Sequence, residues 1–245
     1  MTHITHNQSG LAARLRQLTV GLLVAGSVFA VTATEAVDAR PRTKSEVVAA
    51  EADRALDALA SWQATQAPAD YVRFVQARSE TAALLAAEVE ADDDLLSAEW
   101  AATTTEKQQA LLAALSQLGV PYRRLKSIPD VAFDCSGLTI WAFRMAGLEI
   151  PRVSRDQFRA SAERDHDQAQ PGDLVYYPGH ISIYLGADLM VHSPNSGSHV
   201  EVVQIPTKKS LRFGDIADTV IAANEASRPE LLNTTLVDRS APVTE

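Results

Sequence analysis

The sequence predicts an α+β domain over residues 108–225, in which a helix that carries a cysteine packs against a mainly antiparallel sheet. Three observations support this expectation. The only cysteine of the chain, Cys135, is followed at once by an apolar helical stretch over residues 138–148. Two runs of β-branched, aromatic and other apolar residues, 181–185 and 189–192, have the pattern of strands. The turn between these runs is short enough to join antiparallel neighbours.

The first 39 residues have the pattern of a secretory signal. Two basic residues, Arg14 and Arg16, precede an apolar run over residues 18–31, and small residues follow as far as an acceptable cleavage site at Ala39. A membrane span needs about 20 apolar residues, so this run is short for a span but suits the apolar core of a signal peptide. We therefore predict a signal peptide over residues 1–39 and a secreted protein that works in the cell wall or periplasm. An uncleaved N-terminal anchor is the alternative.

An acidic, alanine-rich helical segment is predicted over residues 40–107. Strong helix formers favour two or three helices, at about 45–66, 69–91 and 94–117. The last of these runs into the opening helix of the following domain. Residues 45–110 hold thirteen Asp and Glu against four Lys and Arg, a balance of −9 that equals the formal charge of the whole chain. The region that follows is therefore near neutral, and the acidic segment argues against a nucleic-acid partner.

Cys135 is predicted to lie in the first turn of its helix, between Asp134 and Ser136. Polar neighbours are unfavourable in a packed core and suit a helix start at the surface of a cleft. The free N–H groups of a first turn favour the thiolate, so we expect a thiol pKa below the usual value of about 8.5. This placement predicts a nucleophile. The alternative is an inert, buried cysteine.

Two histidines are candidates for the base that a cysteine nucleophile needs. His180 lies at the start of the first predicted strand and His192 at the end of the second. Antiparallel pairing would bring the two rings together, so that His180 accepts the thiol proton while His192 orients the His180 ring. Either histidine alone is more often a solvated or core residue. The prediction depends on both occurring together with Cys135.

Residues 109–206 resemble the NlpC-type family of papain-like cysteine peptidases, which cut bacterial peptidoglycan. The family motifs occur in the family's order, with His180 and His192 at the positions of its base and third polar residue; the matching segments are 114–122, 133–138, 150–157 and 170–177. The resemblance implies a papain-like fold and a secreted cysteine endopeptidase without a cofactor. It also implies a substrate, the peptidoglycan stem peptide, and a scissile bond between D-glutamate and the diamino acid.

The resemblance also implies roles for residues near the nucleophile. Tyr122 and Asp134 would bind the free amino group of the first residue of a stem peptide, and Ser154 is a further candidate. Asp134 is equally well explained as the N-cap of the Cys135 helix, and the two roles are compatible. The backbone N–H of Ser136, together with that of Cys135, is a candidate donor to the oxyanion of a tetrahedral intermediate.

One segment departs from the family pattern. Where the family has a Trp/Tyr-Gly-Gly segment, this chain has residues 123–130, without the glycines that let the loop approach the cleft. Arg123, Arg124 and Lys126 either favour a free carboxylate on the substrate or belong to a solvated loop. The turn that begins at Pro171 is interpreted only as a turn.

Several alternatives stay open on the sequence alone. A related cysteine amidase or transacylase would use the same three residues, and a non-catalytic wall-binding module would result if loop 123–130 closed the cleft. A zinc site made by Cys135, His180 and His192 lacks the short-spaced ligand pairs of zinc motifs. No stable membrane insertion is expected after signal cleavage, and residues 226–245 are expected to be a disordered tail.

The acidic helices have three possible roles: a solvated hairpin that spaces the enzyme from the membrane or packs on its back, a partner-binding coil, or an intramolecular lid. In the lid hypothesis they dock over the cleft against the basic loop and regulate the enzyme. Exposed ion pairs contribute little, so docking would also need apolar contacts, for which the candidates are Trp62, Tyr71, Phe74 and Trp100.

Overall fold

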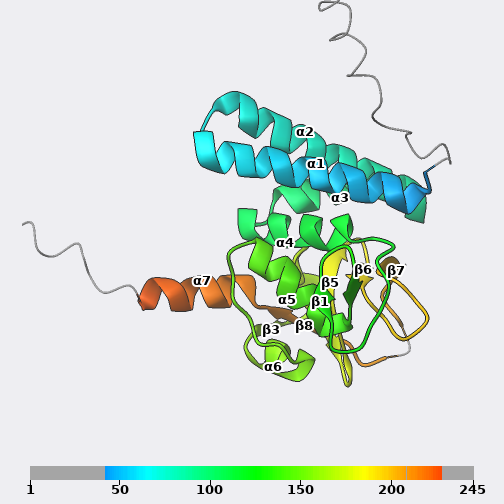
Figure 1. Ribbon diagram of the computed structural model, residues 1–245. Coiled ribbons are helices and arrows are strands. Elements are labelled where there is room, and N and C mark those ends of the chain that lie inside the picture. The colour runs from blue at the N-terminus through cyan, green and yellow to red at the C-terminus, as the bar shows by residue number, and fades with distance from the viewer. Residues whose placement is uncertain (1–41, 208, 228–245) are drawn as a thin grey trace, which may run out of the picture. The chain divides into compact units, whose positions relative to one another are not determined.

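A computed structural model describes residues 42–207 and 209–227 of the chain (Figure 1). The predicted signal peptide and almost all of the predicted tail lie outside these residues. Within the described part of the chain, no helix combines the length and apolar character that a membrane span requires.

Four helices open the described chain: α1 (Lys44–Thr65), α2 (Pro68–Val89), α3 (Asp93–Ala101) and α4 (Thr105–Ser116). Local capping explains where α1, α3 and α4 start. Thr43 forms a capping box with Glu46, and the side chain of Asp92 accepts a hydrogen bond from the N–H of Leu95. The prediction of a single helix over 94–117 is wrong. The side chain of Thr104 accepts a hydrogen bond from the N–H of Lys107 and starts a new helix, α4, after a short break.

Residues 162–215 contain a six-stranded sheet whose order is β3-β8-β4-β5-β6-β7. All of its pairings are antiparallel, as predicted. The strands are β3 (Ala162–Arg164), β4 (Leu174–Tyr177), β5 (His180–Gly186), β6 (Leu189–His192), β7 (Glu201–Gln204) and β8 (Arg212–Asp215). A separate two-stranded ribbon consists of β1 (Ser127–Ile128) and β2 (Ala132–Phe133).

The remaining helical elements are α5 (Cys135–Met145), α6 (Ser154–Arg159), the 3₁₀ turn η1 (His166–Gln168) and α7 (Ala217–Ala226). Helix α5 packs against both α4 and β5. It starts where predicted, with Asp134 as its N-cap. The fold is therefore the expected α+β arrangement, with the cysteine helix on an antiparallel sheet and helices ahead of it.

The N-terminal helices and the sheet share one hydrophobic core. Leu59, Phe74 and Trp100 are buried in the same cluster as residues of α5 and β5. The indole N–H of Trp100 donates a hydrogen bond of 2.7 Å to the carbonyl oxygen of Leu185. Figure 1 shows the α1–α2 pair against α4, in agreement with the contacts between α1 and α4. A domain boundary at 107/108 would cut through α4 and this core.

The same contacts determine where the helices lie relative to the predicted cleft. Leu185 is near the end of β5, whereas His180 is at its start. Arg123, Arg124 and Lys126 are exposed, and among the described residues none of them forms an ion pair with α1–α3. These contacts therefore do not hold the acidic helices over the basic loop as a lid.

A buried ion cluster fastens α4 to the sheet. Lys107 is fully buried, and its Nζ lies 2.9 Å from Oδ1 of Asp173 and 2.8 Å from Oδ2 of Asp215. Arg164 pairs with both carboxylates. Asp173 also accepts from the N–H of Gln170 in the turn that precedes β4. The interpretation of this segment as a turn and nothing more was therefore wrong.

Candidate active site

Cys135 lies where the start of α5 meets β5. Its thiol is close to three backbone N–H groups: its own, that of Ser136, and that of Ile181 in β5. The next N–H of the helix, that of Gly137, is occupied by the carboxylate of Asp134 at 2.6 Å. The thiol is partly exposed. The free N–H groups of this first turn are thus directed at the sulfur.

The predicted acidity of this thiol was wrong. Burial raises the pKa of the Cys135 thiol above its ordinary value, and the negative charge of Asp134 adds to the rise. The N–H groups of Ile181, Ser136 and Cys135 act in the opposite direction without reversing it. Desolvation by the surrounding fold outweighs the helix start, so the resting thiol is protonated at neutral pH.

His180 and His192 are adjacent on neighbouring strands. Nε2 of His180 lies 2.9 Å from Nδ1 of His192, and the two rings are perpendicular, with an interplanar angle of 89°. Both rings are buried. The ring of Tyr177 stacks on His180 with the centroids 4.9 Å apart. The structure therefore brings together the two histidines singled out from the sequence.

Both imidazoles are neutral at physiological pH. Burial, together with the charges of His192 and Lys209, lowers the pKa of His180 to about 3. Burial and Lys209 lower the pKa of His192 to about 4. Since the Cys135 thiol is protonated as well, the resting site is a neutral thiol beside a neutral imidazole pair.

The order of residues along β5 connects the nucleophile to the histidine pair. His180 is followed by Ile181, whose N–H is directed at the Cys135 sulfur. Among the described residues, no hydrogen bond joins the thiol to the His180 ring directly. Catalytic hydrogen bonds are often long before substrate binds. Because Nε2 of His180 is engaged by His192, Nδ1 is the ring atom left to accept the thiol proton.

Asp134 has more partners than an N-cap alone requires. Its Oδ2 accepts from the N–H of Leu125 at 2.7 Å and pairs with Nη2 of Arg152 at 2.9 Å, while Oδ1 holds Gly137. Nη1 of Arg152 also donates to Oγ of Ser136 at 2.8 Å. The N-cap interpretation of Asp134 is confirmed. The carboxylate expected to bind a substrate amine already carries an arginine partner.

The other predicted substrate residues lie on two sides of the site. Tyr122 is half-buried, and burial together with the charges of Cys135 and Asp134 raises the pKa of its phenol. That electrostatic contact places the ring near the nucleophile. Ser154 is the first residue of α6 and lines a hollow of about 280 Å³ that also includes Gly179, the neighbour of His180.

Loop 123–130 forms part of the wall beside the nucleophile. Its carbonyl at Lys126 accepts from the N–H of Asp134 at 3.0 Å, and Oγ of Ser127 donates to the carbonyl of Gly137 at 2.7 Å. A Cβ on Gly137 would lie 1.9 Å from the Lys126 oxygen, so only glycine permits this approach. Leu125, at φ 63°, adopts the left-handed conformation without being glycine. The loop therefore packs closely without the family's glycine pair, and it leaves Cys135 partly exposed.

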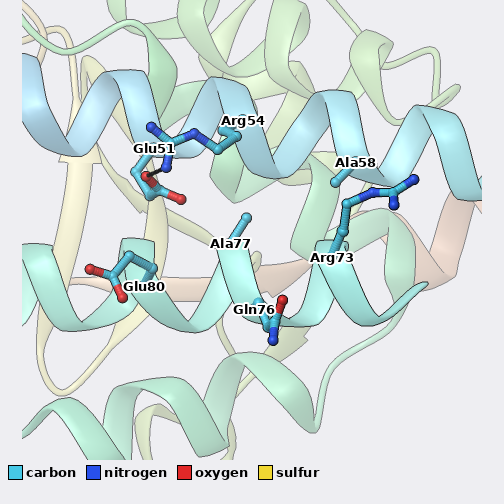
Figure 2. A pocket seen from close by; sticks show the side chains of 7 residues that line it. All are labelled: Glu51, Arg54, Ala58, Arg73, Gln76, Ala77 and Glu80. Carbon is cyan, nitrogen blue, oxygen red and sulfur yellow. Dashed lines mark ion pairs between the residues drawn. The ribbon is translucent and has the colours of Figure 1, made fainter. Parts of the chain in front are cut away.

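A larger hollow, of about 420 Å³, lies between α1 and α2, away from this chemistry. Figure 2 shows its lining side chains, which are Glu51, Arg54, Ala58, Arg73, Gln76, Ala77 and Glu80. Arg54 is paired with Glu51 at 2.5 Å. None of the predicted site residues lines it. Among the described residues, no group of three or more His, Cys, Asp or Glu side chains is arranged to hold a metal ion.

Sequence reasoning missed three residues that contact the site. Arg152 binds the N-cap of α5, and Gln157 donates to the carbonyl of Ser136 at 3.1 Å and accepts from Thr139 at 2.7 Å. Both occur in the Pro-Arg-x-Ser segment, whose polar character at a helix start was the available signal. Glu201 lies beside His192. The feature of the sequence that could have identified Glu201 is its position at the start of the strand that follows the histidine pair.

Comparison with known proteins is consistent with this geometry. The model of the NlpC/P60 family matches residues 119–213. A probable endopeptidase of Corynebacterium glutamicum (strain R) is 31% identical over 199 residues, covering 78% of this chain and 93% of that protein. The bifunctional muramidase/DL-endopeptidase CwlT of Bacillus subtilis (strain 168) is 38% identical over 92 residues, covering 34% of this chain.

The chain covers a smaller share of other relatives than of the C. glutamicum protein. The chain spans only 28% of the length of the B. subtilis protein and 26% of a probable endopeptidase of Mycobacterium bovis. Among solved structures, the P60 domain of an antigen from M. avium subspecies paratuberculosis is 30% identical, with a TM-score of 0.41. That match covers 46% of this chain and 95% of the domain.

Proposed function

Because the chain belongs to the NlpC/P60 family, we propose that it is a cysteine endopeptidase that hydrolyses the stem peptides of peptidoglycan outside the cytoplasmic membrane. One observation carries this proposal: a partly exposed cysteine at a helix start lies close to the backbone N–H of Ile181, and the preceding residue, His180, is buried and hydrogen-bonded to His192. The names of relatives support it, since they include a probable endopeptidase and a peptidoglycan endopeptidase.

The proposed reaction is acyl transfer to water through a thioester. The Cys135 sulfur attacks the peptide carbonyl while Nδ1 of His180 takes the thiol proton. The tetrahedral intermediate collapses, the C–N bond breaks, and protonated His180 gives its proton to the leaving amine. A water molecule, deprotonated by His180, then cleaves the thioester and returns the free thiol.

The neutral resting state determines the timing of the first step. A thiol with a raised pKa and an imidazole with a pKa of about 3 do not exchange a proton before substrate binds. Proton transfer therefore accompanies the attack on the carbonyl, as in general base catalysis. The N–H groups of Cys135 and Ser136, which are directed at the sulfur, are proposed to hold the oxyanion that forms.

The scissile bond is proposed to join D-glutamate to the diamino acid. The B. subtilis relative is named a DL-endopeptidase, which supports this choice. Tyr122 and Ser154 remain proposed contacts of the stem peptide. For Asp134 we propose a positioning role through Arg152, since its oxygens are already occupied. The exposed basic residues Arg123, Arg124 and Lys126 are proposed to be solvated.

The domain arrangement and cellular location belong to the same proposal. A signal peptide over residues 1–39 would direct the chain out of the cytoplasm. The helical segment 40–107 is proposed to act as a structural extension of the peptidase domain, because its apolar residues share the core of the sheet. No cofactor takes part in the proposed reaction.

Incubation of the purified chain with defined muropeptides, followed by mass spectrometry of the products, tests this function. The expected products are a fragment that ends in D-glutamate and a fragment that begins with the diamino acid. Release of an intact stem peptide from the glycan would instead identify an amidase. Binding without any product would identify a wall-binding module. The Cys135→Ala variant is the matched control for contaminating hydrolases.

A further inference from the structure

One buried nitrogen of the histidine pair has no hydrogen-bond partner among the described residues. Nδ1 of His192 is bonded to His180, but Nε2 of His192 is buried and unsatisfied among the described residues. A buried polar atom without a partner destabilises the folded state relative to a satisfied one. The atom therefore requires an explanation, either structural or functional.

Glu201 supplies a carboxylate at this atom. Its Oε1 lies 3.7 Å from Nε2 of His192. The two residues are direct cross-strand partners in the β6–β7 ladder, so their side chains project from the same face of the sheet. The Glu201 side chain is 37% exposed and free to adjust. A shift of less than about 1 Å would bring the oxygen within hydrogen-bond distance.

The position of this carboxylate decides between two tautomers of the pair. In the N···N hydrogen bond between the rings, one nitrogen carries the proton and the other presents a lone pair. If His180 donates through Nε2, its Nδ1 is a lone pair that can accept the Cys135 proton. His192 then carries its own proton on Nε2. If His192 donates through Nδ1 instead, Nδ1 of His180 is already protonated and cannot act as the base.

Only the first tautomer suits a carboxylate at Nε2 of His192. An N–H there would donate to Glu201, whereas a lone pair would face a negative charge. The carboxylate would also stabilise the positive charge that develops on the histidine pair when the thiol proton is transferred. The positive charge of Lys209, on the other hand, disfavours the protonated form of both rings. Glu201 would offset it.

We propose that Glu201 is a positioning residue that holds the proton of His192 on Nε2 and thereby keeps Nδ1 of His180 available as the base. Its effect on turnover rests on the proposed peptidase function, but its effect on the tautomer does not. The relay would run from Cys135 through His180 and His192 to Glu201.

The experiment measures the tautomer and the kinetics of the full chain. Long-range ¹H–¹⁵N correlation spectra of chain labelled with ¹⁵N at histidine report which nitrogen of His192 carries the proton. We expect the Nε2–H form in the wild type and a mixture or the Nδ1–H form in Glu201→Leu. On a defined muropeptide, kcat should fall about ten- to a hundred-fold with KM unchanged, the rate equivalent of one charge-assisted hydrogen bond.

Glu201→Gln provides a second variant in case the leucine variant folds poorly. Its amide oxygen can accept from Nε2–H without the negative charge, so kcat should lie between those of the wild type and Glu201→Leu. Glu163→Gln is the matched control, because Glu163 lies on β3 at the opposite edge of the sheet and pairs with Arg212. It should leave both readouts unchanged.

Two results would overturn the role of Glu201. One is a wild-type His192 with its proton on Nδ1. The other is a tautomer and kcat that stay the same in Glu201→Leu. If the wild type hydrolyses no muropeptide, the peptidase proposal fails on its own, and the spectra of wild type and variants still decide whether Glu201 fixes the tautomer.

Discussion

Nε2 of His180 lies 2.9 Å from Nδ1 of His192, between two rings that are both buried. This contact leaves one nitrogen of His180 for the nucleophile and removes the other from solvent. It also makes the base and its orienting group a single unit, because the protonation of one ring determines what the other ring can donate or accept. The chemistry of Cys135 therefore depends on the strand pairing of β5 with β6.

Replacement of the nucleophile tests the thioester mechanism. Cys135→Ala should lower kcat on a defined muropeptide by about 1,000-fold or more, because no other thiol exists in the chain. Thermal unfolding should change little, since the side chain is small and partly exposed. Hydrolysis that continues at the wild-type rate in this variant would exclude Cys135 as the nucleophile.

The two histidines should differ in their tolerance to substitution. His180→Ala removes the base, and we expect kcat to fall by about 1,000-fold. His192→Gln keeps a hydrogen-bonding group beside His180 and should retain more activity, with a loss of about ten- to a hundred-fold. Steady-state kinetics at constant pH provide the comparison. Equal losses in the two variants would contradict the assigned roles.

Much of this site follows from local sequence patterns. The short turn between two strands was sufficient to predict that His180 and His192 meet, and the helix start at Cys135 was located correctly. The raised pKa of the thiol was not predictable, since it arises from burial by the whole fold. Arg152 and Glu201 were missed for a similar reason: each meets its partner through packing or strand register rather than through a sequence motif.

The neutral histidines make stability depend on pH. The unfolded chain takes up protons on His180 and His192 below about pH 6.5, whereas the folded chain does so only near their depressed pKa values of about 3 and about 4. Between these limits the unfolded state binds more protons. The stabilising contribution of each buried neutral histidine is thus complete above about pH 6.5 and is lost as pH falls, toward about 4 for His192 and about 3 for His180.

The expected slope is up to about 1.4 kcal/mol of unfolding free energy per pH unit for each histidine. Urea unfolding at pH 7, 6 and 5 measures it. His192→Gln cannot take up this proton and should have a smaller slope than the wild type over the same range. Identical slopes for the two proteins would show that His192 is not buried in the neutral form.

The buried cluster around Lys107 predicts a large loss of stability. Lys107→Met removes the cation that lies between Asp173 and Asp215 and leaves both carboxylates buried. The loss should be about 3 kcal/mol or more in denaturant unfolding, although Arg164 still neutralises part of the charge. Lys126→Met, at an exposed position, is the control and should change stability by less than about 0.5 kcal/mol.

Substitution of Trp100 tests whether the N-terminal helices have a structural or a regulatory role. Its ring is fully buried, and its indole N–H donates to the carbonyl of Leu185, so it joins α3 to β5. Trp100→Ala should lower the unfolding free energy by about 3–5 kcal/mol. Trp100→Phe keeps most of the ring and removes the indole donor to the Leu185 oxygen, which should cost about 1–3 kcal/mol.

The kinetic result distinguishes the two roles. If the helices are part of the core, Trp100→Phe should have the wild-type kcat at temperatures well below its Tm, at low and at high salt alike. If they instead close the cleft by docking, weaker docking should raise kcat, and salt should raise it further by screening the acidic helices. Val72→Ala is the matched control, since Val72 is an apolar residue of α2 that is 52% exposed and is not one of the candidate docking contacts. A rise in kcat for Trp100→Phe, absent from Val72→Ala, would establish the lid and contradict the structural role inferred from the Trp100–Leu185 hydrogen bond.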